Sequence, residues 1–72
     1  MNLAQFEAIA TLISSREPAK SAARRVLVDG VENIEAAREF DLSRQSVSNT
    51  VGRFRAAEAT ILTAYRPLHK SS

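Results

Sequence analysis

Apolar residues recur at helical spacing near the start of the chain. They fall on one face of a helix: Leu3, Phe6, Ile9, Ala10 and Ile13. This spacing predicts an amphipathic helix over about residues 3–14, and Asn2 stands where an N-cap is needed. A second apolar stripe follows Pro18, which suits the first position of a helix. We expect this shorter helix to end at Asp29, with Gly30 as its C-terminal cap.

The next apolar positions predict two helices joined by a tight turn. Asn33 is expected to cap a third helix over about residues 34–40, and Ser43 a fourth. Small residues at 36 and 37 allow two helices to cross closely, and apolar residues at 40, 42 and 47 fill the angle between them. Asp41 stands where the chain must reverse, so we expect it to adopt a left-handed or bridging backbone conformation.

The fourth helix is expected to be long, because apolar residues continue at four- and three-residue steps from Val47 to Tyr65. Such spacing fits one helix of about 23 residues, or about 34 Å. It also fits a break near Gly52, since glycine costs about 1 kcal/mol inside a helix. We favour one helix ending before Pro67. With no strand pattern in the sequence, the fold class is predicted to be all-α.

A chain of 72 residues allows one domain. We expect that domain over residues 1–66, with a dimerisation helix over about 54–66 and a flexible tail over 67–72. A core of this size supplies about 3–5 kcal/mol, and without cysteine there is no disulfide to support it. His69 is the single histidine, so no metal site or other cofactor is expected. Self-association remains as the source of extra stability.

The sequence offers neither a membrane span nor the parts of an enzyme. No apolar run approaches the roughly 20 residues that a bilayer requires, so we expect a soluble, cytoplasmic protein. The serines have no histidine or lysine placed to activate them, and no glycine-rich phosphate loop is present. We therefore expect no catalysis, and so short a chain leaves little room for a small-molecule ligand.

Charge is divided unevenly along the chain. The net charge is +2. Through Phe40 there are five lysines or arginines against six acidic residues, whereas from Asp41 onward there are five against two. The basic excess therefore falls on the half that begins at the fourth helix, which favours a polyanionic partner for that half.

The residues from 33 to 53 match a helix-turn-helix that places its second helix in the DNA major groove. The polar side chains expected to face outward contain no carboxylate between Asp41 and Glu58: Ser43, Arg44, Gln45, Ser48, Asn49 and Arg53. Arginine pairs with guanine, glutamine and asparagine with adenine, and serine with a base or a phosphate. Arg53 and Arg55 have a second possible role as phosphate contacts. The pattern thus predicts binding to double-stranded DNA.

Two interpretations without DNA binding remain open. The same pattern fits a plain helical hairpin, because capped short helices with a turn are common. It also fits a small protein-interaction module, an adaptor or inhibitor, that binds a partner through its C-terminal amphipathic helix. Retention on duplex DNA that falls steeply with salt separates these alternatives from a DNA-binding protein.

Three segments resemble the KorA (TrfB-type) transcriptional repressors of broad-host-range plasmids: Gln5-Phe6, Ala23 to Gly30, and Leu42 to Asn49. The similarity covers roughly residues 3–58. It implies a five-helix DNA-binding domain, a dimer on a palindromic operator, and base contacts from Arg44, Asn49 and Arg53. It also implies repression of plasmid promoters.

KorA repressors continue into a separate C-terminal dimerisation region, and we expect an apolar seam on the last helix to take its place here. The seam consists of Phe54, Ile61, Leu62 and Tyr65. A two-fold dimer through it would set two recognition helices about 34 Å apart, one turn of DNA. The alternative is that the seam folds back on the first helix, against Phe6 and Ile9.

Overall fold

The computed structural model describes the backbone of residues 1–71 and the side chains of residues 1–62. These residues form four helices, α1 (Leu3–Leu12), α2 (Ala19–Leu27), α3 (Asn33–Glu39) and α4 (Arg44–Ser71). No strand occurs in residues 1–71, which confirms the predicted all-α class. The count is four helices over these residues, rather than the expected five or so.

The first helix begins as predicted and ends earlier. The side chain of Asn2 accepts a hydrogen bond from the Gln5 amide (2.8 Å), and the Gln5 side chain accepts one from the Asn2 amide (3.1 Å), which makes a capping box. Ser14 has a positive φ of 55°. The Ser15 amide then donates to the Ala10 carbonyl at 2.9 Å, closing the helix with a Schellman-type turn. The helix therefore stops at Leu12 instead of residue 14.

The predicted turn between α3 and α4 is confirmed at Asp41, whose φ is 53°. The Leu42 amide donates to the Ala37 carbonyl at 2.8 Å, again a Schellman-type closure. Ser43 caps α4 as expected, because its hydroxyl accepts a hydrogen bond from the Ser46 amide at 3.1 Å.

Two of the other predicted helix starts are displaced by one residue. Glu32, not Asn33, occupies the N-cap position of α3, and no side chain caps that helix. Asn33 instead directs its amide toward α4. Pro18 likewise stands at the N-cap of α2 rather than at its first helical position. The predicted end of this helix at Asp29, with Gly30 as its cap, was wrong, because α2 ends at Leu27 and Val28 is its C-cap. Gly30 lies in the turn that follows, with a φ of 81° that suits glycine.

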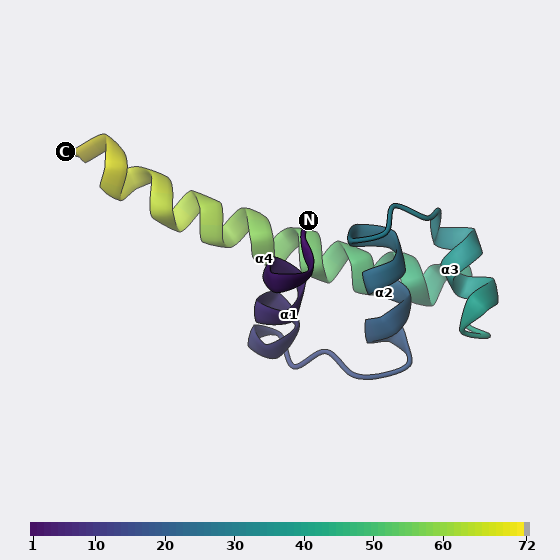
Figure 1. Ribbon diagram of the computed structural model, residues 1–72. Coiled ribbons are helices and arrows are strands. Elements are labelled where there is room, and N and C mark those ends of the chain that lie inside the picture. The colour runs from purple at the N-terminus through teal and green to yellow at the C-terminus, as the bar shows by residue number, and fades with distance from the viewer. Residues whose placement is uncertain (72) are drawn as a thin grey trace.

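The last helix is unbroken at Gly52, which confirms the interpretation of this region as one helix. The predicted helix end before Pro67 was wrong, because α4 continues through Pro67 to Ser71. The flexible tail over 67–72 stays a prediction. Proline has a fixed φ that suits a helix, and the loss of one backbone hydrogen bond does not end the helix here. Ser72 lies outside the described residues. Figure 1 shows the C-terminal part of α4 projecting past α1.

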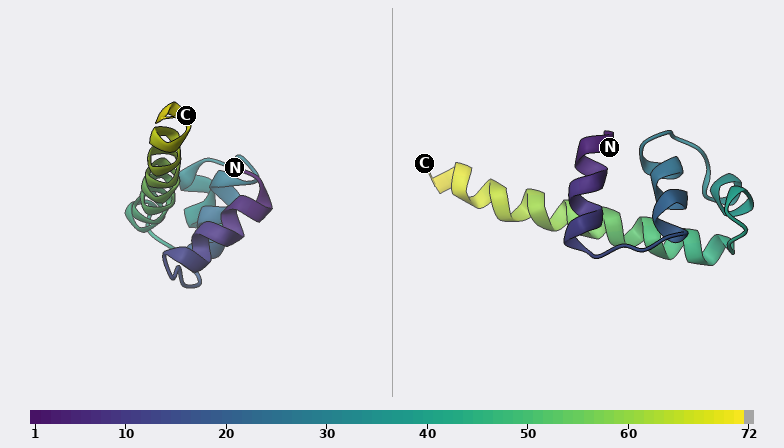
Figure 2. Two further views of the ribbon diagram at one scale, coloured as in Figure 1. Left: turned by 90° about the vertical axis from the view of Figure 1, so that its left-hand side faces the viewer. Right: turned by 60° about the horizontal axis from the view of Figure 1, so that its bottom comes forward.

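The core forms where α1, α2 and α3 pack on the N-terminal half of α4 (Figures 1 and 2). Its centre is a stacked pair of rings, Phe6 of α1 and Phe54 of α4, with centroids 4.5 Å apart and an interplanar angle of 13°. Both rings are fully buried. The remaining buried apolar residues are Ile9, Ala10, Ala22, Ala23, Leu27, Ala36, Ala37, Val47 and Val51.

The predicted place of Phe54 in the dimer seam is wrong. Its ring is fully buried against Phe6 inside one chain, so it is not available to a second copy. The alternative that the seam folds back on the first helix holds at this position. Over the described part of the chain, no helix has both the length and the hydropathy to cross a membrane.

The positive φ of Asp41 makes a stability prediction. Asp41→Gly should be tolerated, whereas Asp41→Val should lower the free energy of unfolding by about 1–3 kcal/mol, because a β-branched side chain is strained in the left-handed region. Glu35→Val, at an exposed helical position of α3, is the control and should cost less than about 1 kcal/mol. Thermal melts of the three variants measure the differences. An Asp41→Val variant as stable as the parent would contradict the tight turn.

Candidate nucleic-acid interface

The outer face of α4 lies opposite the buried side chains of Val47, Val51 and Phe54. Most of the residues predicted from the sequence as DNA contacts are exposed, and one is half-buried. The exposed ones are Ser43, Arg44, Gln45, Asn49, Arg53 and Arg55, and the half-buried one is Ser48. No acidic residue occurs in α4 before Glu58. This half of the helix therefore presents a polar surface whose only charges are positive.

Gln45 and Asn49 are joined on this face. The Gln45 side-chain amide donates to the Asn49 side-chain oxygen at 2.9 Å, one helical turn away. Each amide still has unused capacity, because Gln45 keeps its carbonyl oxygen and Asn49 keeps its amide hydrogens. The pair thus offers both acceptors and donors to the outside from a restrained position.

Two serines of the predicted site serve the fold. Ser43 caps α4, and the Ser48 hydroxyl accepts a hydrogen bond from the Asn33 side-chain amide at 3.0 Å in a part-buried setting. This second contact ties the start of α3 to the first turns of α4. Asn33 was missed as a positioning residue because its sequence setting is typical of a helix cap, and only the crossing of the two helices brings it to Ser48.

Arg53 lies at one edge of the outer face. It follows the buried Thr50 by three residues, so it stands next to the packed side of α4. Its guanidinium donates through Nη2 to the Ile13 carbonyl at 3.2 Å, at the end of α1. Arg53 therefore faces the connection between α1 and α2 rather than the middle of the exposed face.

Arg44 and Arg55 differ from Arg25 in their surroundings. Neither forms an ion pair or a hydrogen bond with a side chain among residues 1–62. Arg25, by contrast, is held between Glu39 (Nε to Oε1, 2.8 Å) and Asp29 (Nη1 to Oδ2, 2.9 Å). These contacts raise the pKa of Arg25 and lower that of Glu39, and they tie α2 to α3.

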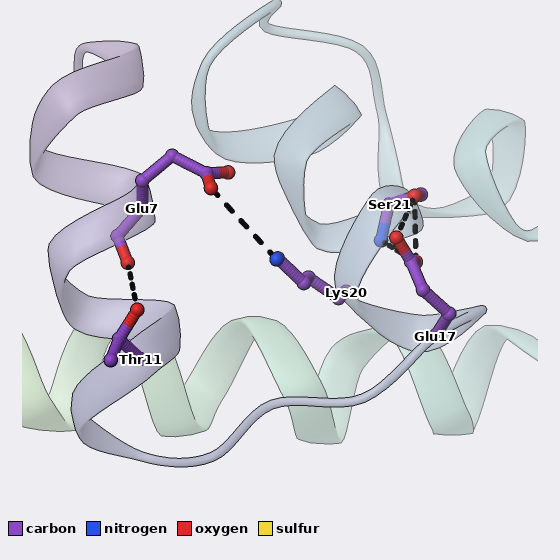
Figure 3. Close-up of polar contacts among 5 residues, drawn as sticks. All are labelled: Glu7, Thr11, Glu17, Lys20 and Ser21. Carbon is purple, nitrogen blue, oxygen red and sulfur yellow. Dashed lines mark hydrogen bonds and ion pairs between the residues drawn. The ribbon is translucent and has the colours of Figure 1, made fainter.

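The connection between α1 and α2 is also ordered by local polar contacts (Figure 3). The Glu17 carboxylate accepts hydrogen bonds from the Ser21 amide (2.8 Å) and the Ser21 hydroxyl (2.6 Å) at the start of α2. The hydroxyl contact is the main reason that the pKa of Glu17 lies below its ordinary value. Lys20 lies 3.9 Å from Glu7 across the two helices, an exposed pair of little energetic weight.

Gly52 occupies the middle of the outer face. A Cβ added there would meet nothing within 4 Å, so internal packing does not require glycine at this position. An alanine would make a better helix by about 1 kcal/mol. Gly52 therefore makes α4 less stable than alanine would. Without a side chain, it leaves the helix backbone open between the neighbouring polar side chains.

A second exposed surface is apolar. Ile61 and Leu62 of α4 are 45% and 51% exposed, and they border a groove beside α1. The groove is lined by Gln5, Ala8, Ile9, Glu58, Ile61 and Leu62. Of the four seam residues, Phe54 is thus buried and Ile61 and Leu62 are open, while the side chain of Tyr65 lies outside the described residues.

No family model, no curated protein and no solved structure matches this chain.

Proposed function

We propose that this protein is a sequence-specific regulator that binds double-stranded DNA and represses transcription by occupying promoter DNA. The observation that carries the proposal is the outer face of α4. It is acid-free from Arg44 to Ala57, and the guanidinium groups of Arg44 and Arg55 have no partner among the described side chains. A solvated helix face ordinarily mixes acidic and basic residues, whereas a surface that meets phosphates carries an excess of positive charge.

The arrangement around α4 supports this use. Helices α3 and α4 are joined by the short turn at Asp41, and α2 packs on both of them. Helix-turn-helix proteins use such an arrangement to present the second helix of the pair to the major groove, with the residues of its first turns at the base edges. Arg44, Gln45 and Asn49 stand in those first turns.

The proposed roles follow from side-chain chemistry. Arg44 would donate two hydrogen bonds to a guanine, and the joined amides of Gln45 and Asn49 would read an adenine. Arg55 would neutralise a phosphate and add affinity without sequence information. The resemblance to KorA-type repressors supports plasmid or mobile-element promoters as the targets.

The working species in this proposal is a homodimer on a palindromic operator. Ile61 and Leu62 are large, exposed and adjacent, on a helix whose end projects past the rest of the chain (Figure 2). Burial of large apolar side chains such as these is favourable. A second copy of the chain would cover this surface and supply the two-fold symmetry that a palindrome matches.

The function is tested by fluorescence anisotropy with a labelled duplex of about 20 base pairs, two turns of DNA, over a salt series. We expect tight binding at low salt, with log K falling linearly against log[salt]. Selection from a random duplex library should then enrich one palindromic sequence. A protein that does not bind duplex DNA at low salt would refute the proposal, and would leave the protein-interaction module as the remaining interpretation.

If side chains of α4 contact bases, their removal should weaken binding only at the preferred DNA sequence. Arg44→Ala and Asn49→Ala should each weaken binding there by about 1–3 kcal/mol and leave binding to random DNA nearly unchanged. Competition titrations measure the ratio of the two affinities. Arg38→Ala, an exposed arginine on α3 beside Glu35, is the control and should keep that ratio. Parental ratios in both α4 variants would show that this face does not read bases.

Gly52 predicts opposite effects on stability and binding. Gly52→Ala should raise the free energy of unfolding by about 0.5–1 kcal/mol, because the new methyl group has open space and the helix improves. The same methyl group should weaken DNA binding by holding α4 away from the base pairs.

The matched control is Gly30→Ala, which also has open space around its Cβ but a φ of +81°. It should lower stability by about 1–2 kcal/mol. Chemical denaturation and the anisotropy assay measure both effects. If Gly52→Ala binds as tightly as the parent, the middle of this face is not in contact with DNA.

The dimer predicts a change in mass with one substitution. Sedimentation at micromolar concentration should give a dimer for the parent and a monomer for Ile61→Asp, because a carboxylate cannot be buried unpaired in an apolar interface. Helix content should be preserved, since Ile61 is already half-exposed in one chain. Thr60→Asp, with the same charge one residue away, should remain dimeric. A monomeric parent that binds a full palindrome without cooperativity would contradict the dimer.

A further inference from the structure

A polar groove runs along the other edge of the proposed DNA-binding face. It lies between α4 and the connection from α1 to α2, which runs beside α4 in the right-hand view of Figure 2. Its lining residues are Ile13, Ser14, Ser15, Arg16, Glu17, Ala19, Thr50 and Arg53. Two arginines from segments far apart in the sequence therefore border the same open groove.

The geometry of duplex DNA indicates which part of the DNA would lie in this groove. The major groove of B-DNA is about 12 Å wide, and an α-helix with its side chains is about 10–12 Å across. A helix placed in the groove therefore has a sugar-phosphate backbone along each flank. Arg55 lies two turns after Ser48, on the side of α4 that contacts Asn33 of α3, and so stands toward one flank. The arginines of the groove stand on the opposite flank.

We propose that this groove holds the sugar-phosphate backbone of one strand of bound duplex DNA, with Arg16 and Arg53 as phosphate-binding residues. The inference rests on the proposed function and assigns Arg53 to a phosphate rather than to a base. The anchor at the Ile13 carbonyl uses only one of the five N–H groups of Arg53 and orients the rest of the guanidinium at the rim. Arg16 is exposed, and its side chain forms no hydrogen bond or ion pair with a described residue.

The chemistry of the rim suits a phosphodiester. Ser14 and Ser15 add hydroxyl donors to the two guanidinium groups. Glu17 is the one acidic residue in the lining, and its carboxylate accepts hydrogen bonds from the Ser21 amide and hydroxyl. The two arginines outnumber it, so the lining keeps a positive net charge. A guanidinium pair at the edge of the face would fix the register of α4 on the duplex without carrying sequence information.

The test measures counterion release for Arg16→Gln, Arg53→Gln and Arg53→Lys on the same labelled duplex in a mixed sequence. The slope of log K against log[salt] is negative for a DNA-binding protein. Each Gln variant should make it less steep by about 0.9, the value for one lost phosphate contact. Arg53→Lys should keep the slope. Arg24→Gln is the matched control, because it removes the same charge from an exposed side chain on the α1-facing side of α2 and should leave the slope unchanged.

The outcomes separate the inference from the proposed function. If the parent binds DNA and both Gln variants keep its slope, the groove holds no phosphate, although α4 still binds DNA. If Arg24→Gln reduces the steepness of the slope as much as Arg16→Gln does, the change reflects the overall charge of the protein, and phosphate binding in the groove is again refuted. If the parent does not bind duplex DNA, the proposed function fails and this inference fails with it. Arg16→Gln breaks no hydrogen bond or ion pair among the described residues, so a change in its slope is not caused by the loss of such a contact.

Discussion

The stacking of Phe6 on Phe54 joins the first helix of the chain to the last, and the placement of α1 against α4 depends on it. The two rings are fully buried and lie 4.5 Å apart. In so small a core most of the other buried residues are alanines and valines, so this pair supplies a large share of the apolar area that folding removes from water. It holds α1 beside α4, which in turn brings the Ile13 carbonyl to Arg53.

Some polar residues at the start and along the first half of α4 form contacts that hold the fold together, and others face solvent. Ser43 and Ser48 are engaged in capping and in the contact with Asn33, and Arg53 is anchored to the end of α1. The side chains of Arg44, Gln45, Asn49 and Arg55 form no hydrogen bond or ion pair with a described residue outside their own helix. A surface of this kind combines rigidity with unused hydrogen-bonding capacity, because the engaged residues fix the helix on which the unengaged ones stand. Preorganisation of this sort lowers the entropy lost on binding.

Local chemistry was sufficient to predict the elements of the fold, whereas contacts between distant segments were not. The cap at Asn2, the left-handed Asp41 and the cap at Ser43 each depend on residues within one turn, and all three were predicted correctly. Phe54 was assigned to an intermolecular seam because spacing alone shows that a residue is apolar, not which surface covers it. For the same reason the roles of Asn33 and Arg53 were not predictable, since their partners lie 15 and 40 residues away. Pro67 does not end α4, because proline has a φ that a helix accepts.

One face of α4 packs in the core and the other faces solvent. A change in α4 can therefore alter both the stability of the fold and the binding of a partner. Gly52 and the non-glycine residues Ser14 and Asp41 at positive φ each lower the stability of a domain that has little to spare. A partner that binds only the folded chain adds stability by mass action, by about 2.7 kcal/mol at a concentration of about 100 Kd. Occupation of the outer face of α4, or of the apolar surface at Ile61 and Leu62, would therefore offset these costs. Because the two surfaces lie on one continuous helix, a contact at either would stabilise that helix.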